Sequence, residues 1–264
     1  MGIVVQMLLW AWIVLDSGVC SVSLPEITDG KFIDECVREH NEARSSVSPS
    51  ASDMLYMTWD EGLAITARAW ARHCVFEHNI YLKDVRRVHP TFSSVGENIW
   101  TGYPPSTFDV QGAIKSWVDE KQDYDYSSNV CTHICGHYTQ VVWASTYKVG
   151  CAAQLCPNGV KNTEFASEEG VIFVCNYATA GNVNERRPYE RGTSCSGCKG
   201  NCEKKLCRSQ ERDSQKSYNW TPDWDPALAT NYATILIVRP TALIFTFITA
   251  YAVHHFYPDV FCYE

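Results

Sequence analysis

The stretch Gly136-His137-Tyr138-Thr139-Gln140-Val141-Val142-Trp143 (GHYTQVVW) begins directly after Cys135 and ends eight residues before Cys151. Tyr, Thr, Val and Trp in close succession favour a pleated, half-buried strand. In a strand the side chains alternate, which predicts His137, Thr139, Val141 and Trp143 on one face and Tyr138, Gln140 and Val142 on the other. Taken alone, a histidine that opens such a strand is more often a hydrogen-bonded core residue than a metal ligand. Its role therefore depends on the rest of the chain.

Length and composition describe a globular protein. The chain has 264 residues, of which 45% are apolar and 20% charged. This is enough to bury a core in one good-sized domain with appendages, or in two small domains. The net charge of −8 argues against nucleic acid as a partner, because phosphate binding requires concentrated Lys and Arg.

Cysteine usage indicates the secretory pathway. Thirteen cysteines are far more than a typical cytosolic enzyme carries, and they favour disulfides in an oxidising compartment. The N-terminus agrees, since Met7 to Leu15 is apolar and small residues follow from Gly18 to Ser23. We therefore predict a signal peptide over residues 1–23. Myristoylation of the Met-Gly start is disfavoured, because its motif requires Ser or Thr where Gln6 stands.

The pattern of apolar residues predicts three helices followed by strands. Asp60 is the expected N-cap of the second helix, and Thr28 or Asp29 that of the first. Helices that precede a group of strands indicate an α+β fold or a layered α-β-α design. The expected helices are Phe32–Arg44, Trp59–Cys74 and Asp109–Tyr124, the expected strands are Val149–Leu155 and Gly170–Tyr177, and Val95–Gly102 is expected to be a constrained loop beside a short strand.

A small cysteine-rich segment follows, over residues 183–208. Its four cysteines have almost no apolar neighbours, so the segment cannot build a core of its own and requires cross-links. A zinc knuckle is the alternative, but no histidine lies nearby and the spacing is unlike two separated CxxC pairs. The sequence therefore predicts two disulfides among Cys195, Cys198, Cys202 and Cys207.

The C-terminal part reads as a stalk and a membrane anchor. Residues 209–231 are polar and contain the sequon Asn219-Trp220-Thr221, which predicts an exposed stalk glycosylated at Asn219. Residues 232–253 are apolar except around Arg239, and a helix of this length would span about 33 Å, enough for a bilayer. We predict a transmembrane helix with a cytoplasmic tail over residues 254–264. A GPI signal and a buried helix are the alternatives.

Several motifs in this order resemble the CAP superfamily, named for cysteine-rich secretory proteins, antigen 5 and pathogenesis-related protein 1. The resemblance runs from Phe32 to Cys207, and the four-cysteine segment with the apolar stretch most resembles the glioma pathogenesis-related group. Ala178–Ala180 departs from it, because the family more often has a proline-containing turn there. The six-cysteine, channel-regulating module of cysteine-rich secretory proteins is absent from the sequence. The motifs are GHYTQVVW, Phe76–Asn79, Gly96–Trp100, Trp117–Glu120, Cys175–Tyr177 and Gly181–Asn182.

The resemblance implies a three-layer α-β-α sandwich over residues 24–182, with a cleft lined by His78, His137, Glu97 and Glu120. Two neutral imidazoles can bind Zn²⁺ or another divalent metal weakly, while the carboxylates orient the imidazole N–H groups. The resemblance also implies a groove for sterols, other lipids or protein ligands, with roles in immune defence or reproduction.

Three functions remain open on this basis. The first is a secreted or membrane-tethered binding protein, and the second is a zinc-dependent hydrolase with Glu97 or Glu120 as general base. The third is an adhesion module whose cleft is vestigial. Neither an HExxH nor a GxSxG motif occurs, so we expect binding rather than catalysis. The alternative without a functional site is that the four cleft residues only form a buried polar network that stabilises the fold.

The main domain contributes six more cysteines expected to form disulfides, namely Cys74, Cys131, Cys135, Cys151, Cys156 and Cys175. Six cysteines allow fifteen pairings, and only Cys131 with Cys135 is assigned, because they can close a small loop before GHYTQVVW. Cys36 is left over on the apolar face of the first helix. We expect it to be a buried thiol rather than a nucleophile.

Overall fold

The computed structural model describes residues 23–215 and 220–256. Four strands form its main sheet, in the order β1 (Thr58–Trp59), β5 (Lys148–Cys156), β6 (Gly170–Ala178) and β2 (Gly96–Gly102). Strand β1 runs parallel to β5, and the other two pairs are antiparallel. The predicted strands β5 and β6 are confirmed, and both are interior. The segment at 95–102 is a seven-residue edge strand rather than mainly a loop.

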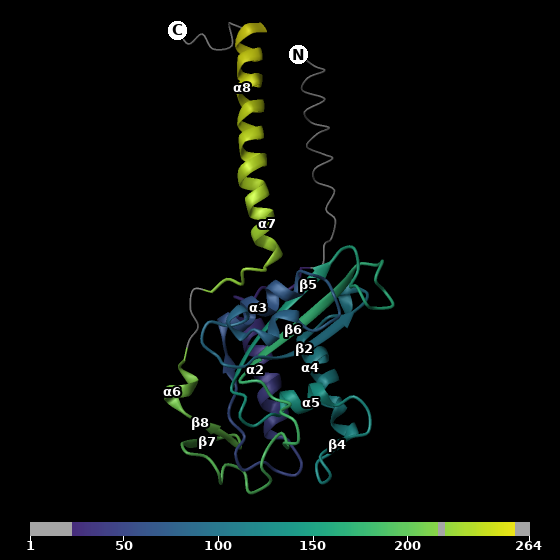
Figure 1. The fold of residues 1–264 in the computed structure, drawn as a ribbon, viewed down its shortest axis with the longest axis vertical. Helices are drawn as coiled ribbons and strands as arrows, with labels where there is room; N and C mark the ends of the chain where they lie inside the picture. Colours follow the sequence, from purple (N-terminus) through teal and green to yellow (C-terminus); the bar gives the residue numbers. More distant parts are fainter. Residues whose placement is uncertain (1–22, 216–219, 257–264) are drawn as a thin grey trace.

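Helices cover both faces of this sheet (Figure 1), as the α+β prediction requires. Helix α3 (Glu61–Ala71) packs on one face, and α2 (Gly30–Ser45) and α4 (Val110–Asp119) pack on the other. Strand β6 supplies both cores, because Ile172 and Val174 point toward α3 while Phe173 and Tyr177 point toward α2 and α4. A strand buried on both faces is apolar at nearly every position, which explains the run GVIFVCNY.

An aspartate precedes each of the three helices that pack on the sheet. The side chains of Asp29, Asp60 and Asp109 accept hydrogen bonds from backbone N–H groups in the first turns of α2, α3 and α4. The third helix ends at Asp119, earlier than predicted, and continues as the 3₁₀ turn η4. The remaining short elements of the domain are η1 (Ile80–Lys83), η2 (Val85–Arg87), η3 (Pro105–Thr107), η4 (Glu120–Asp123), β3 (Tyr124–Asp125) and β4 (Val130–Cys131).

The strand predicted for GHYTQVVW is wrong, because Gly136–Val141 forms the short helix α5. Four consecutive side chains, Tyr138 to Val141, are buried, so the expected alternation of faces does not exist. A distant carboxylate stabilises the helix instead: Glu120 accepts hydrogen bonds from the backbone N–H groups of His137 and Tyr138, at 3.0 and 3.2 Å. These first-turn donors have no partner within a helix. Local strand propensity yields to this tertiary contact.

Five disulfides cross-link the described residues: Cys74–Cys156, Cys131–Cys135, Cys151–Cys175, Cys195–Cys202 and Cys198–Cys207. Cys131 and Cys135 are paired with each other as predicted. Cys36 is a buried free thiol on α2, and burial raises its pKa well above the ordinary range. The extension forms a hairpin of β7 (Asn201–Glu203) and β8 (Leu206–Arg208) followed by the single-turn helix α6 (Gln210–Asp213). The Cys207 N–H donates to the Met54 carbonyl and attaches this hairpin to the domain.

Part of the predicted stalk, around Trp220 to Asp225, packs on the domain rather than being exposed throughout. Trp224 is buried against α3 and stacks on Tyr81 at 4.9 Å between ring centroids. Beside it, Asp225 forms an ion pair with Arg72 at 2.6 Å, and Trp220 donates from Nε1 to the Thr66 hydroxyl. Two tryptophans within a polar run explain why this segment docks. Asn219 lies outside the described residues, as does the predicted signal peptide except for its last residue, Ser23.

The described residues end in a long helix that projects away from the domain (Figure 1). It comprises α7 (Pro226–Ala233), the π-helical segment η5 (Thr234–Val238) and α8 (Arg239–Phe256). Within it, Ile235–Phe256 has 22 residues with a mean hydropathy of 1.7 and is not buried by the rest of the protein. By length and composition this segment is a candidate membrane span.

Candidate functional site

His137 and Glu120 form the first of two His–Glu pairs. His137 is the second residue of α5, and its Nδ1 lies 2.6 Å from Glu120 Oε1. The other carboxylate oxygen, Oε2, is the one that accepts the two backbone N–H groups of α5. The Trp117 ring stacks on the imidazole with 6.3 Å between centroids, and the His137 side chain keeps 26% of its surface exposed. One carboxylate therefore both begins the helix and fixes the imidazole.

His78 and Glu97 form the second pair. His78 Nδ1 lies 3.0 Å from Glu97 Oε1, which also accepts the N–H of Asn79 at 2.9 Å. Glu97 lies on β2 with its side chain fully buried, whereas the His78 side chain is 64% exposed. With its amide nitrogen turned toward Glu97, Asn176 donates to Oε2 at 3.2 Å. Both oxygens of this buried carboxylate are thereby satisfied.

The second pair is also coupled electrostatically. The hydrogen bond with the Glu97 carboxylate raises the pKa of His78, and desolvation partly opposes this. Burial raises the pKa of Glu97, and the bonds from His78 and Asn79 act in the opposite direction. The pair therefore retains a proton on the imidazole Nδ1.

Both imidazoles are held in the same manner. An ionised carboxylate only accepts, so Nδ1 must carry the proton in each histidine. In the neutral imidazole this leaves a lone pair on Nε2, which is the arrangement of a metal-binding histidine with an orienting carboxylate. In the part of the chain that the structure describes, no hydrogen bond engages Nε2 of His78 or His137.

Strand β2 connects the two pairs. Asn98 follows Glu97 directly, and its side chain donates to the backbone carbonyl of His137 at 3.1 Å and to the Tyr177 hydroxyl at 3.3 Å. Within residues 23–215 and 220–256, no three or more His, Cys, Asp or Glu side chains form a group that could hold a metal. The four predicted residues are thus two dyads joined through adjacent residues of one strand.

A buried polar network behind α5 involves residues that the sequence did not single out for the site. Arg44 on α2 is fully buried and donates to five backbone carbonyls, including Val141 at 2.9 Å and Trp143 at 2.7 Å. One turn earlier, His40 Nε2 lies 2.9 Å from the Tyr177 hydroxyl, and burial lowers its pKa to about 4. Arg44 holds the end of α5 against α2, and His40 connects α2 to β6. In the sequence, both residues lie on the inward face of the first helix, with Arg44 four positions after His40, and this spacing could have indicated a buried polar pair.

Comparison with known proteins identifies the family. The family described as "CAP: Cysteine-rich secretory protein family" matches residues 37–177. The chain belongs to the CAP family. This CAP protein is 48% identical to GLIPR1-like protein 1 of Bos taurus over 217 residues, which cover 80% of the chain and 86% of the relative. It is 42% identical to glioma pathogenesis-related protein 1 of Mus musculus over 266 residues, covering 98% of each. The predicted resemblance to the glioma pathogenesis-related group is confirmed.

Solved structures share the fold. The structure of Na-ASP-1 aligns with a TM-score of 0.55 and 25% identity, covering 71% of this CAP protein and 52% of that chain. A structure titled as NaASP2 with Zn²⁺ aligns with a TM-score of 0.53 and 27% identity, covering 68% and 96% of the two chains. The CAP fold, with helices on both faces of a mixed sheet, is therefore established for this protein.

Proposed function

We propose that this CAP protein is a membrane-tethered binding protein whose two His–Glu dyads together hold one exchangeable divalent metal. The main support for this proposal is that a carboxylate fixes Nδ1 of both His78 and His137, which leaves Nε2 of each imidazole for a ligand. Zn²⁺ is the metal that this donor set fits best, because imidazole nitrogen is one of its usual ligands. The bound metal would supply open coordination positions to an oxygen of the binding partner.

The proposed location is the extracellular face of a secretory-pathway membrane. Residues 1–23 would be removed as a signal peptide, 24–182 form the binding domain and 183–208 the cross-linked extension. Residues 209–231 connect the domain to a transmembrane helix over 232–253, and 254–264 would face the cytoplasm. The apolar, unburied segment Ile235–Phe256 supports the anchor, and five disulfides support the oxidising compartment. The proposed partners are a sterol or other lipid, or an extracellular protein.

Hydrolysis at the same site is disfavoured by the hydrogen bonds of the carboxylates. A general base must be free to accept a proton from water. Glu120 accepts three hydrogen bonds from α5, and Glu97 accepts from His78 and Asn79 while its second oxygen faces Asn176. Both carboxylates are engaged in positioning, which supports binding as the function.

Equilibrium dialysis of the full chain in detergent, with metal content read by mass spectrometry, tests the metal proposal. We expect one Zn²⁺ per chain and loss of that Zn²⁺ in His78→Ala and His137→Ala. His133→Ala is the matched control, because His133 is also paired with a carboxylate, Asp123 Oδ1 at 3.1 Å, but is 81% exposed. Retention of Zn²⁺ in both dyad variants, or its loss in His133→Ala, would contradict the proposal. Mass spectrometry of lipids that co-purify with the same sample identifies the partner class.

A further inference from the structure

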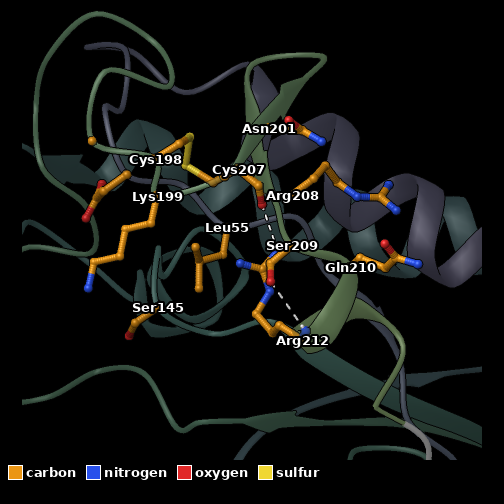
Figure 2. Close-up of a pocket in the computed structure, with 13 residues that line it drawn as sticks. Leu55, Ser145, Cys198, Lys199, Asn201, Cys207, Arg208, Ser209, Gln210 and Arg212 are labelled. Carbon is orange, nitrogen blue, oxygen red and sulfur yellow. Dashed lines mark hydrogen bonds between the residues drawn. A yellow bond between two sulfur atoms is a disulfide. The ribbon is translucent and has the colours of Figure 1, made fainter.

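A cavity lies between the cysteine-rich extension and the body of the domain (Figure 2). Its volume is about 620 Å³, within the range of small-molecule sites, and it contains none of the four dyad residues. The extension contributes the loop from Gly197 to Asn201 together with Cys207 and Arg208, and Ser209, Gln210 and Arg212 follow directly after it. The body contributes Asp53, Leu55 and Ser145.

Basic side chains dominate the rim of this cavity. Lys199, Arg208 and Arg212 line it, against Asp53 as the one acidic lining residue. Asp213, which lines the adjoining cavity along β7, accepts from Arg208 at 2.7 Å and from Arg212 at 2.7 Å, and Glu203 pairs with Arg208 at 3.2 Å, so both guanidinium groups are held in place. Lys199 is exposed, and no contact is recorded for its side chain in the described residues. Residues 183–213 carry eight Lys and Arg against five Asp and Glu, in a chain whose net charge is −8. This local excess favours an anionic partner.

The floor of the cavity is apolar. Leu55 lies between Lys199 and Arg212, and the Cys198–Cys207 disulfide closes the wall beside it (Figure 2). Ser145 lines the cavity on the side of the domain body. A peptide carboxylate placed between Lys199 and Arg212 would therefore leave room for a neighbouring apolar side chain to pack on Leu55.

An open strand edge leads away from the cavity. Asn201 lines it and begins β7, whose three residues are all exposed and which, among the described strands, pairs only with β8. An adjoining cavity of about 580 Å³ runs along β7 from Asn201 to Glu203 and shares Asn201, Arg208 and Gln210 with the 620 Å³ cavity. An unpaired edge offers backbone donors and acceptors to an added strand. A compact anion would not use this edge, whereas an extended peptide would.

We propose that this surface binds an extended acidic peptide segment of another protein. A Glu or Asp side chain of the peptide lies between Lys199 and Arg212, the next apolar side chain packs on Leu55, and the peptide backbone pairs with β7. The site is separate from the His–Glu dyads, so it does not depend on metal.

Matched arrays of immobilised hexapeptides test this proposal with the full chain in detergent. One array carries Glu followed by Leu, Val or Phe at fixed positions, and the other carries Gln in place of Glu. We expect the Glu array to retain the protein at least about tenfold better, since opposite charges across an interface determine specificity. Lys199→Glu should lower retention by about tenfold, because it places a like charge at the rim. Ser145→Trp should lower it similarly by filling the cavity.

Lys161→Glu is the control, because it makes the same charge change at an exposed position in the loop between β5 and β6. Equal retention on both arrays, or equal losses in Lys199→Glu and Lys161→Glu, would overturn the proposal. Undiminished retention of Ser145→Trp would also overturn it, since the occupied volume would then lie elsewhere.

Discussion

Replacing Glu120 separates the two roles that its carboxylate combines. One oxygen accepts two backbone N–H groups of α5, and the other accepts Nδ1–H of His137 at 2.6 Å. Loss of a helix N-cap costs about 0.5–2 kcal/mol, and each buried donor left unpaired costs about 1–3 kcal/mol. The Glu120 side chain is 18% exposed, so water reaches some of these donors. We therefore expect Glu120→Ala to lower the free energy of unfolding by about 2–3 kcal/mol.

Glu120→Gln should behave differently. The amide oxygen can still accept the backbone N–H groups, so the free energy of unfolding should fall by less than about 1 kcal/mol. The amide NH₂ would then face Nδ1 of His137 as a donor and shift the imidazole proton to Nε2. A protonated Nε2 cannot bind metal, and loss of an orienting partner typically weakens metal affinity by about 10–100-fold.

Urea denaturation and zinc titration of the full chain measure the two effects side by side. The expected pattern is low stability and weak zinc binding in Glu120→Ala, but near-normal stability and weak zinc binding in Glu120→Gln. Normal zinc affinity in Glu120→Gln would refute the assigned tautomer. Equal destabilisation in both variants would show that the amide cannot begin α5, and would refute the capping role.

Three further predictions concern the rest of the fold. Burial holds the folded-state pKa of His40 at about 4, below its ordinary 6.5, so the unfolded chain binds more protons and stability falls as pH drops from 6.5 through 4. His40→Gln should remove roughly 3 kcal/mol of this pH dependence, measured by urea denaturation of both proteins between pH 6.5 and 4. The prediction fails if the free energy of unfolding falls equally with pH in the two proteins. Cys156→Ser removes the Cys74–Cys156 disulfide and should lower the free energy of unfolding by about 4–5 kcal/mol, because the disulfide joins positions 82 residues apart. An unchanged urea midpoint would contradict this. Trp224→Ala should cost about 2–3 kcal/mol and expose residues 220–226 to protease, whereas Phe256→Ala, at an exposed position, should change neither.

The periodic helices and the apolar strands follow from local sequence. The stripe of the first helix, the aspartates before the first two helices and the apolar run of β6 each express burial or capping that a few neighbouring residues determine. These features were predicted correctly within a few residues, because no distant partner is needed to form them. Helix ends were less well predicted, since tertiary contacts decide where the chain turns away.

The central stretch was mispredicted because its conformation depends on a contact across seventeen positions. Nothing in GHYTQVVW indicates that the carboxylate of Glu120 accepts the first N–H groups of α5. Trp224 is a similar case, because its binding site on α3 and Tyr81 is assembled only by the fold. The four dyad residues were found through family resemblance, whereas the roles of Asn98 and Arg44 emerged from the structure.

The central claim is that two carboxylate-oriented imidazoles present Nε2 to one metal ion. Zinc K-edge X-ray absorption spectroscopy of the full chain loaded with one equivalent of Zn²⁺ measures those ligands directly. We expect two imidazole nitrogens at about 2.0–2.1 Å with oxygen in the remaining positions, reduced to one imidazole in His78→Ala or His137→Ala. Sulfur ligation, or a spectrum that neither substitution changes, would contradict it.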